Sequence, residues 1–254
     1  MGEAILSRLL STHTYSPDRI IVSHPRSERR DYLQSQYGVV VVAENWQVEC
    51  DILLLAIKPQ QLFDLEVTSE VDQISCNLLV SILAGCSLER LADAFSTKLP
   101  IVRAMPNTPA QVGAGMTCFA CNDLVTEDHK QRVKNIFLAV GEVLEVPEYW
   151  MDAVTGLSGS GPGYVAVAIE ALIDGAVMMG LPRSVAQTLA VQTVLGSAQY
   201  LQTTGIDPAL LKNKVTSPGG TTIAGIHALE RHGLRLALME AVKAATLRSE
   251  ELDR

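Results

Sequence analysis

Short apolar runs recur through the first half of this chain, and their spacing restricts the folds that it can adopt. The runs are rich in β-branched residues and are separated by polar or helix-forming stretches: residues 20–22, 39–42, 52–57, 78–83, 101–102, 116–121 and 143–146. Continuous apolar runs of this kind are typical of strands buried on both faces of a parallel sheet. Helices between the strands supply the crossovers that parallel pairing requires. The first half is therefore predicted to form a doubly wound α/β sheet.

Near residue 148 this pattern gives way to helical periodicity. The predicted helices cover residues 164–179, 182–203, 207–213 and 221–252. Pro182 and Pro208 mark two of the helix starts, because proline is favoured in the first helical turn. The long helices carry more apolar surface than two amphipathic stripes require, which predicts burial against a second copy of the chain. We therefore predict an α/β domain over 1–147 and an all-α dimerisation domain over 148–254.

The start of the chain lacks a glycine motif that the predicted sheet leads us to expect. A dinucleotide-binding domain normally opens with a strand, then Gly-x-Gly-x-x-Gly, then a helix. Here Met1-Gly2-Glu3-Ala4 resembles the last step of that motif and runs into an amphipathic helix over 3–10. We expect the first strand and two glycines to lie upstream of residue 1; the alternative is a chain that has lost cofactor binding. Because that strand sits in the middle of the sheet, its loss should divide the core.

Composition and patterning argue against several classes of function. The net charge of −8 and the pI near 5.1 argue against a nucleic-acid surface, which needs clustered Lys and Arg. The apolar runs are too short to cross a bilayer, and polar residues from Ser7 to Arg19 break any signal peptide. No membrane partner and a cytoplasmic location are therefore expected. The cysteines are odd in number and scattered, and Cys118 and Cys121 have no second ligand pair, which predicts reduced thiols and no metal.

The ends of the predicted strands hold the candidate cofactor site, because ligands of open α/β sheets bind beyond the carboxyl ends of the strands. The candidates are Ser23, Arg26, Ala56, Ile57, Lys58, Pro59, Ala84, Gly85 and Asn107. No acidic residue follows the strand at 20–22 to bind ribose hydroxyls, whereas Ser23 and Arg26 suit a 2′-phosphate. This favours NADPH, with NADH as the alternative. A solvated basic loop explains the same residues equally well.

A stretch rich in proline and glycine, Val215-Thr216-Ser217-Pro218-Gly219-Gly220-Thr221-Thr222, precedes the last predicted helix. The glycines leave the backbone bare, and a helix start offers unpaired N–H groups and the positive end of the helix dipole. These features suit an anion, and the two threonine hydroxyls can form hydrogen bonds beside it. Taken alone, the stretch also fits a turn capped by Ser217 and followed by an ordinary helix.

Three motifs together give the chain a specific resemblance. They are Val-Arg-Ala-Met-Pro-Asn-Thr-Pro at 102–109, Thr-Gly-Leu-Ser-Gly-Ser-Gly-Pro at 155–162 and the stretch at 215–222. In this order, over essentially the whole chain, they are similar to the pyrroline-5-carboxylate reductase family. The resemblance implies NAD(P)H-dependent reduction of 1-pyrroline-5-carboxylate to L-proline. It also implies a Rossmann-type N-terminal domain and a helical domain that forms a homodimer, often assembled further into a decamer.

The resemblance also implies roles for individual residues. Substrate binding falls on Ser217, Gly219, Gly220, Thr221 and Thr222, and Thr222 carries the hydroxyl that acts near the ring nitrogen. An acidic residue of the substrate region falls on Glu148. An Asn that often precedes the strand at 52–57 in the family has only Asn45 as a possible substitute.

Two other functions fit parts of the pattern. Another small-acid or imine reductase, such as a 2-hydroxyacid or ketopantoate type, would rely on a helix-borne Lys or Asn. Lys130, Lys134 and Lys243 are available but stand in no motif that suggests this role. A catalytically impaired oligomeric scaffold is the other alternative, and binding of NADPH distinguishes it from an enzyme.

Overall fold

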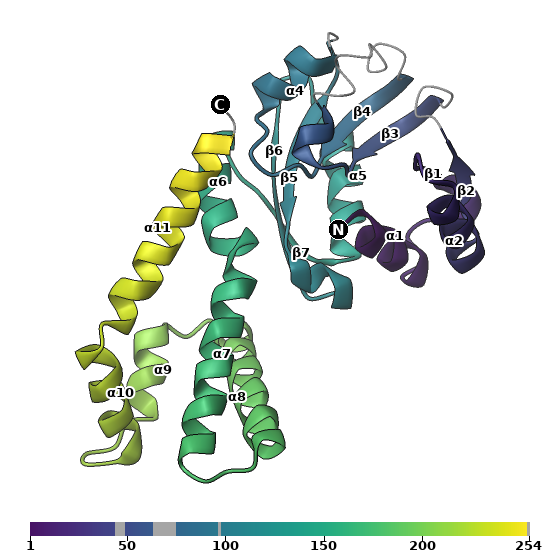
Figure 1. Ribbon diagram of the computed structural model, residues 1–254. Helices are drawn as coiled ribbons and strands as arrows, with labels where there is room; N and C mark the ends of the chain where they lie inside the picture. The colour runs from purple at the N-terminus through teal and green to yellow at the C-terminus, as the bar shows by residue number, and fades with distance from the viewer. Residues whose placement is uncertain (44–48, 63–74, 96–97, 253–254) are drawn as a thin grey trace. The chain divides into compact units, whose positions relative to one another are not determined.

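The computed structural model describes residues 1–43, 49–62, 75–95 and 98–252, so Asn45 lies outside the described residues. The chain forms two compact units (Figure 1): Met1–Ser160 with Lys243–Arg254, and Gly161–Val242. Each unit is described by itself below. By contacts, residues 148–160 and the end of the last helix belong with the first unit. The domain boundary predicted after residue 147 stays a prediction.

The first unit holds all seven strands that the apolar runs predict. They are β1 (Ile21–Ser23), β2 (Val40–Val42), β3 (Glu49–Leu55), β4 (Ser75–Ser81), β5 (Ile101–Pro106), β6 (Gly115–Cys121) and β7 (Gly141–Glu145). β1 and β2 pair in parallel as a separate two-stranded sheet, and the other five form one sheet in the order β3-β4-β5-β6-β7.

One strand pair departs from the all-parallel sheet that the sequence predicts. β5 pairs with β6 in antiparallel register, with Ala104 opposite Phe119, whereas the β3–β4, β4–β5 and β6–β7 pairs are parallel. Only the short 3₁₀ helix η4 (Thr108–Val112) connects β5 to β6. A parallel pair needs a crossover of a dozen residues or more, so this short connection enforces a reversal of direction.

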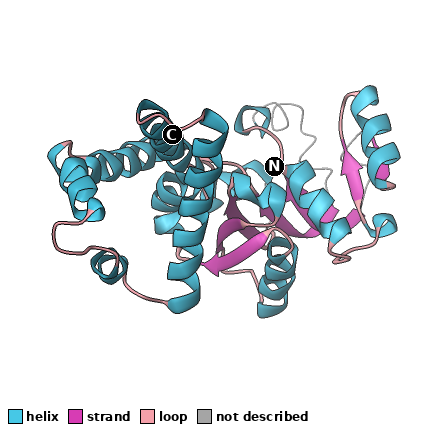
Figure 2. Ribbon diagram, turned by 90° about the horizontal axis from the view of Figure 1, so that it is seen from below, coloured by secondary structure: helices cyan, strands magenta, loops and turns pink. Residues whose placement is uncertain are grey.

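Helices cover both sides of the larger sheet (Figure 2), as buried parallel strands require. They are α1 (Gly2–Ser11) and α5 (Glu127–Leu138) on one face and α4 (Leu88–Phe95) on the other, whereas α2 (Ser27–Tyr37) packs against the smaller sheet. Leu79 and Leu91 pack in the core on one face, and Leu78 and Phe137 pack in the core on the other. Successive side chains of β4 point to opposite faces of the sheet, as in any strand. Because both sets of side chains are packed in a core, both faces of the sheet are buried. A third, small cluster of Leu6, Leu33 and Val39 supports β1 and β2.

The second unit consists of helices. They are α7 (Gly161–Met178), α8 (Arg183–Thr204), α9 (Pro208–Lys214), α10 (Thr221–Arg231) and the first part of α11 (Leu234–Leu252). The single helix predicted over 221–252 is wrong, because the helix breaks at His232 and Gly233. Gly233 has φ 69°, a left-handed conformation that ends helices and that glycine adopts without strain.

The helices of this unit leave many large apolar side chains exposed. Val167 is 66% exposed and Met178 86% exposed, while only Ala186 and Ala190 are buried on α8. Among the described residues, Glu148–Met178 is the one helical stretch long and apolar enough to cross a membrane by length and composition, which is weak evidence. The same exposed surface suits a subunit interface, because monomers rarely expose large apolar patches.

Candidate active site

The N-terminus of α1 lies at the carboxyl end of β3. A Cβ atom at Gly2 would lie 2.9 Å from the Cβ of Ala56, so these two small residues permit the close approach. No side chain of the described residues caps this helix start, which leaves its first N–H groups unpaired. Ala56, Lys58 and Pro59 are exposed beside it and Ile57 is half-buried. The arrangement offers backbone donors and a positive helix end to an anionic group, as a dinucleotide pyrophosphate requires.

The loop after β1 is basic. Ser23 is half-buried and Arg26 is exposed, and the Arg26 N–H donates to Nδ1 of His24 at 3.2 Å. Burial lowers the pKa of His24, and the charge of Arg26 lowers this pKa further. Arg30 donates to the carbonyl oxygen of His24, which fixes the loop. The loop therefore combines a hydroxyl with positive charge, the chemistry that a 2′-phosphate needs.

The Ala84–Gly85 turn follows β4 and precedes α4. Gly85 is buried with φ 59°, and a Cβ atom there would lie 2.5 Å from the Cβ of Leu252, near the end of α11. Ser87 caps α4 by accepting the Arg90 N–H at 3.1 Å. The backbone of this turn is thus fixed by its glycine, by the cap and by α11.

Asn107 uses both ends of its side-chain amide inside the protein. Its Oδ1 accepts the Met116 N–H at 2.9 Å, and its Nδ2 donates to the carbonyl oxygen of Ser158 at 3.2 Å. Ser158 lies in the π-helical segment η6 (Thr155–Gly159), a form that occurs often at functional sites. Gly159 allows Met105 of β5 to approach this segment closely. Asn107 therefore joins the end of β5 to the second sequence motif; its cofactor role stays a prediction.

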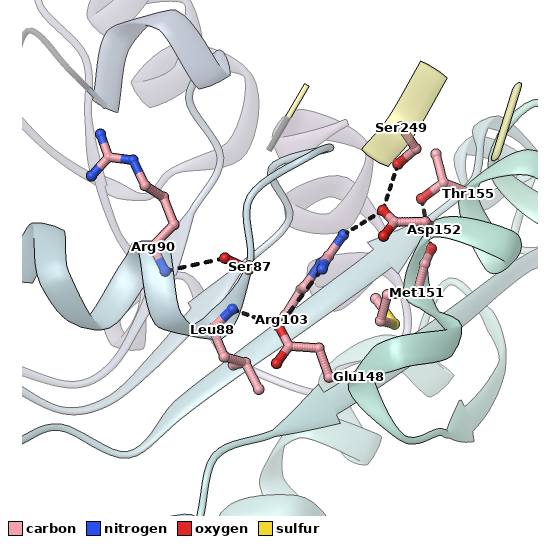
Figure 3. A network of polar contacts seen from close by, with 9 residues as sticks. All are labelled: Ser87, Leu88, Arg90, Arg103, Glu148, Met151, Asp152, Thr155 and Ser249. Carbon is pink, nitrogen blue, oxygen red and sulfur yellow. Dashed lines mark hydrogen bonds and ion pairs between the residues drawn. The ribbon is translucent and has the colours of Figure 1, made fainter. Parts of the chain in front are cut away.

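A buried arginine organises the polar network in Figure 3. Arg103 of β5 is 4% exposed, and its guanidinium lies 3.1 Å from Oδ1 of Asp152 and 3.6 Å from Oε1 of Glu148. Glu148 Oε1 accepts the Leu88 N–H at 2.6 Å, at the start of α4. Ser249 of α11 donates to Oδ1 of Asp152 at 2.8 Å. Glu148 is thus held by partners within the first unit while its side chain stays 36% exposed, and its predicted substrate role stays a prediction.

The predicted substrate loop lies in the second unit, between α9 and α10. Gly219 has φ 67°, and Gly220 is the N-cap of α10 with no side chain to satisfy the first N–H groups of the helix. Thr222 is half-buried in the first turn, whereas Ser217 and Thr221 are exposed. A Cβ atom at Gly220 would collide with Oγ of Ser217. A larger residue at Gly220 would therefore have to displace the Ser217 side chain, and the loop presents bare backbone donors beside two threonine hydroxyls.

The structure brings the predicted residues together in two groups. Those from Ala56 to Asn107, with Ser23, Arg26 and Glu148, belong to the first unit, and Ser217 to Thr222 belong to the second. Sequence reasoning missed Arg103, Asp152 and Ser249. One signal was available for Arg103, which is a charged residue inside an apolar strand.

Comparison with known proteins defines the class of this fold and site. Residues 1–85 match the model of the coenzyme F420-dependent NADP oxidoreductase family, and residues 148–252 match the pyrroline-5-carboxylate reductase dimerisation model. The chain is thus an oxidoreductase with a Rossmann-type domain for an NAD(P) cofactor and a helical dimerisation domain. It belongs to the pyrroline-5-carboxylate reductase family.

Individual relatives and solved structures agree over nearly the whole chain. The pyrroline-5-carboxylate reductase of Synechocystis sp. is 55% identical over 99% of this chain and 94% of its own. That of Arabidopsis thaliana is 44% identical over 99% and 92%. The solved structure of a pyrroline-5-carboxylate reductase from Coxiella burnetii has a TM-score of 0.91 at 34% identity, and the match covers 100% of this chain and 95% of that one. The crystal structure of Plasmodium falciparum pyrroline carboxylate reductase with NADP bound has a TM-score of 0.86 at 30% identity, with the same coverage.

Proposed function

We propose that this protein reduces 1-pyrroline-5-carboxylate to L-proline with NADPH, and that Thr222 handles the proton at the ring nitrogen. The observation that carries the assignment of residues is the start of α10, where uncapped N–H groups, Gly220 and the half-buried Thr222 meet in one helical turn. Membership of the pyrroline-5-carboxylate reductase family supports the substrate. The reaction saturates a cyclic C=N bond by adding a hydride to carbon and a proton to nitrogen.

The substrate carboxylate binds at the N-terminus of α10 in this proposal. The N–H groups of Thr221 and Thr222 form part of the positive end of the helix dipole, which stabilises an anion. The Gly220 N–H donates to the carbonyl oxygen of Ser217 at 3.1 Å and closes the turn before them. Gly219 allows the turn to adopt its left-handed conformation, and Gly220 leaves the backbone open to the carboxylate. Binding through backbone donors fixes the ring in one orientation, and positioning of this kind supplies much of the rate enhancement of a bimolecular reaction.

Thr222 lies in the first turn of α10, beside the carboxylate site. Its Oγ1 can donate to or accept from the ring nitrogen, which gains a proton as the adjacent carbon is reduced. A hydroxyl that holds this nitrogen orients the carbon face and steers protonation without acting as a strong base.

The first unit fits NADPH. In the proposal the N-terminus of α1 and Ala56 to Pro59 hold the pyrophosphate, Ser23 and Arg26 hold the 2′-phosphate, and Ala84, Gly85 and Asn107 line the remaining cofactor site. Gly2 and Ala56 leave space because neither has a large side chain, and the charges around His24 suit a phosphate. When bound, NADPH supplies the hydride. The chain acts as a homodimer through its helical domain, with further assembly to a decamer and a cytoplasmic location as parts of the proposal.

Replacing Thr222 tests its role. Thr222→Val should lower kcat by about one to three orders of magnitude, because a positioned proton-handling group typically contributes about that much. Gly220→Val should instead raise KM for 1-pyrroline-5-carboxylate, because the new side chain blocks the backbone and displaces Ser217. Steady-state kinetics with both substrates varied measures the two effects.

Thr222→Ser is the matched control, because it keeps the hydroxyl and should retain most of the activity. Wild-type turnover in Thr222→Val would remove the role assigned to Thr222. Calorimetric titration of the unmodified protein with NADPH separates the enzyme from the scaffold alternative, since a scaffold would not bind. Assays with 2-keto acids in place of the cyclic imine test the other reductases.

A further inference from the structure

The end of α11 contacts the turn that the proposed function assigns to the cofactor. We infer that Ser249 and Leu252 are positioning residues, which hold the Ala84–Gly85 turn in the conformation that binds NADPH. Neither residue belongs to a motif at the strand ends, and both lie in the last helix, far along the chain. The role in cofactor binding rests on the proposed function. The coupling between the end of α11 and the Ala84–Gly85 turn rests only on contacts within the first unit.

Ser249 anchors the helix end. Its side chain is 2% exposed, and its hydroxyl donates to Oδ1 of Asp152 at 2.8 Å. The same carboxylate oxygen lies 3.1 Å from Nη2 of Arg103. A carboxylate held by a buried guanidinium has a fixed position, so the hydrogen bond from Ser249 fixes the rotation of α11 about its axis.

Leu252 is one helical turn beyond Ser249. Residues i and i+3 share one face of a helix, so the anchored serine directs Leu252 to the same side of α11. There its Cβ would lie only 2.5 Å from a Cβ at Gly85, and Gly85 itself is buried. The Cβ and backbone of Leu252 thus occupy the space that a side chain at the turn would need, whereas the residue as a whole is 52% exposed. Removal of the Leu252 Cβ would leave the left-handed turn without this contact.

The network also reaches the far end of the same turn. Arg103 contacts Glu148, whose carboxylate accepts the Leu88 N–H at the start of α4. The segment from Gly85 to Leu88 is therefore fixed at both ends by groups that meet at Arg103: Glu148 at Leu88, and α11, through Asp152 and Ser249, at Gly85. A simple packing role for the last helix would not require a buried polar anchor beside a left-handed glycine.

Hydrogen exchange tests the coupling without any cofactor. In the full chain, Leu252→Gly, which removes the Cβ against Gly85, and Ser249→Ala should raise amide exchange in the segment 84–87 by roughly five- to tenfold, because local opening becomes easier. Exchange in β6 and β7 should not change. Glu250→Gly is the matched control, since Glu250 is exposed on the same helix between the two residues. Unchanged exchange at 84–87 in both variants would overturn the inference.

Cofactor binding tests the functional consequence. Leu252→Gly should raise KM and Kd for NADPH by about tenfold while kcat at saturating NADPH changes by less than about twofold, the pattern of a lost binding contribution. Ser249→Thr, which keeps the hydroxyl, should restore the affinity that Ser249→Ala loses. Equal NADPH affinity in Leu252→Gly and Glu250→Gly would also overturn the inference. Absence of NADPH binding by the unmodified protein would contradict the proposed function instead, and the exchange result would still decide the coupling.

Discussion

At the scale of single residues, the loop after β1 shows how charge prepares a site for an anion. Burial is the main cause that lowers the pKa of His24 below 6.5. The charges of Arg26, Arg29 and Arg30 lower this pKa further. A protonated His24 is therefore less favourable in the folded than in the unfolded chain. The unfolded state binds this proton more readily as pH falls below 6.5, so the folded state loses stability in that range. A phosphate bound at Arg26 would oppose this effect.

The titration of His24 provides a pH test. In NMR titrations its midpoint should lie below 6.5, Arg26→Ala should move it upward, and NADPH should raise it more than NADH, because only NADPH carries the 2′-phosphate. Arg19→Ala serves as the control, since Arg19 is an exposed arginine that does not act on His24. An unchanged midpoint in Arg26→Ala would contradict this electrostatic account of the loop.

At the scale of elements, the two sheets of the first unit differ in how they are supported. β3 to β7 form a five-stranded sheet with packed side chains on both faces. β1 and β2 are three residues long, and Ile21 and Val40 are exposed. Among the residues that the structure describes, only the small cluster around Leu6, Leu33 and Val39 supports them. An isolated two-stranded sheet is marginally stable, so this pair depends on α1 and α2.

Amide exchange should separate the two sheets. The amides of β1 and β2 should exchange at least about tenfold faster than those of β4 and β5, because fewer buried contacts oppose local opening. Leu33→Ala should accelerate exchange in β1 and β2 and leave β4 unchanged. Leu210→Ala is a suitable control, since Leu210 is exposed in the helical unit. Equal protection in the two sheets would show that β1 and β2 have support beyond the small cluster.

At the scale of the whole molecule, the helical unit cannot bury its own apolar surface. α7 has no buried residue, and Leu189 and Leu195 of α8 are 54% and 56% exposed. At about 25 cal/mol per Å² of apolar surface, covering helices of this size against a second copy is strongly favourable. The match of residues 148–252 to a dimerisation domain agrees with this expectation.

A charge on this surface should prevent assembly. Leu189→Glu should shift the protein from dimer to monomer in sedimentation experiments, because an unpaired carboxylate would be buried at the interface. Val112→Glu is the control, since Val112 is 77% exposed in the first unit. A dimer that persists in Leu189→Glu would place the interface away from this part of α8.

The sequence alone determined where most strands and helices form, because the spacing of apolar residues and the preferences of turn residues depend on a few neighbouring positions. It also indicated the strand ends and the loop from Ser217 to Thr222, since glycine and proline reveal backbone requirements locally. The antiparallel direction of β6 and the helix break at Gly233 also had local causes, which are a short connection before β6 and a glycine at the end of α10. The prediction missed both features because it followed the periodicity of apolar residues alone. Only the tertiary structure placed Arg103 between Glu148 and Asp152 and brought Leu252 to Gly85. These partners are far apart in the chain, and no local pattern encodes a contact that packing creates.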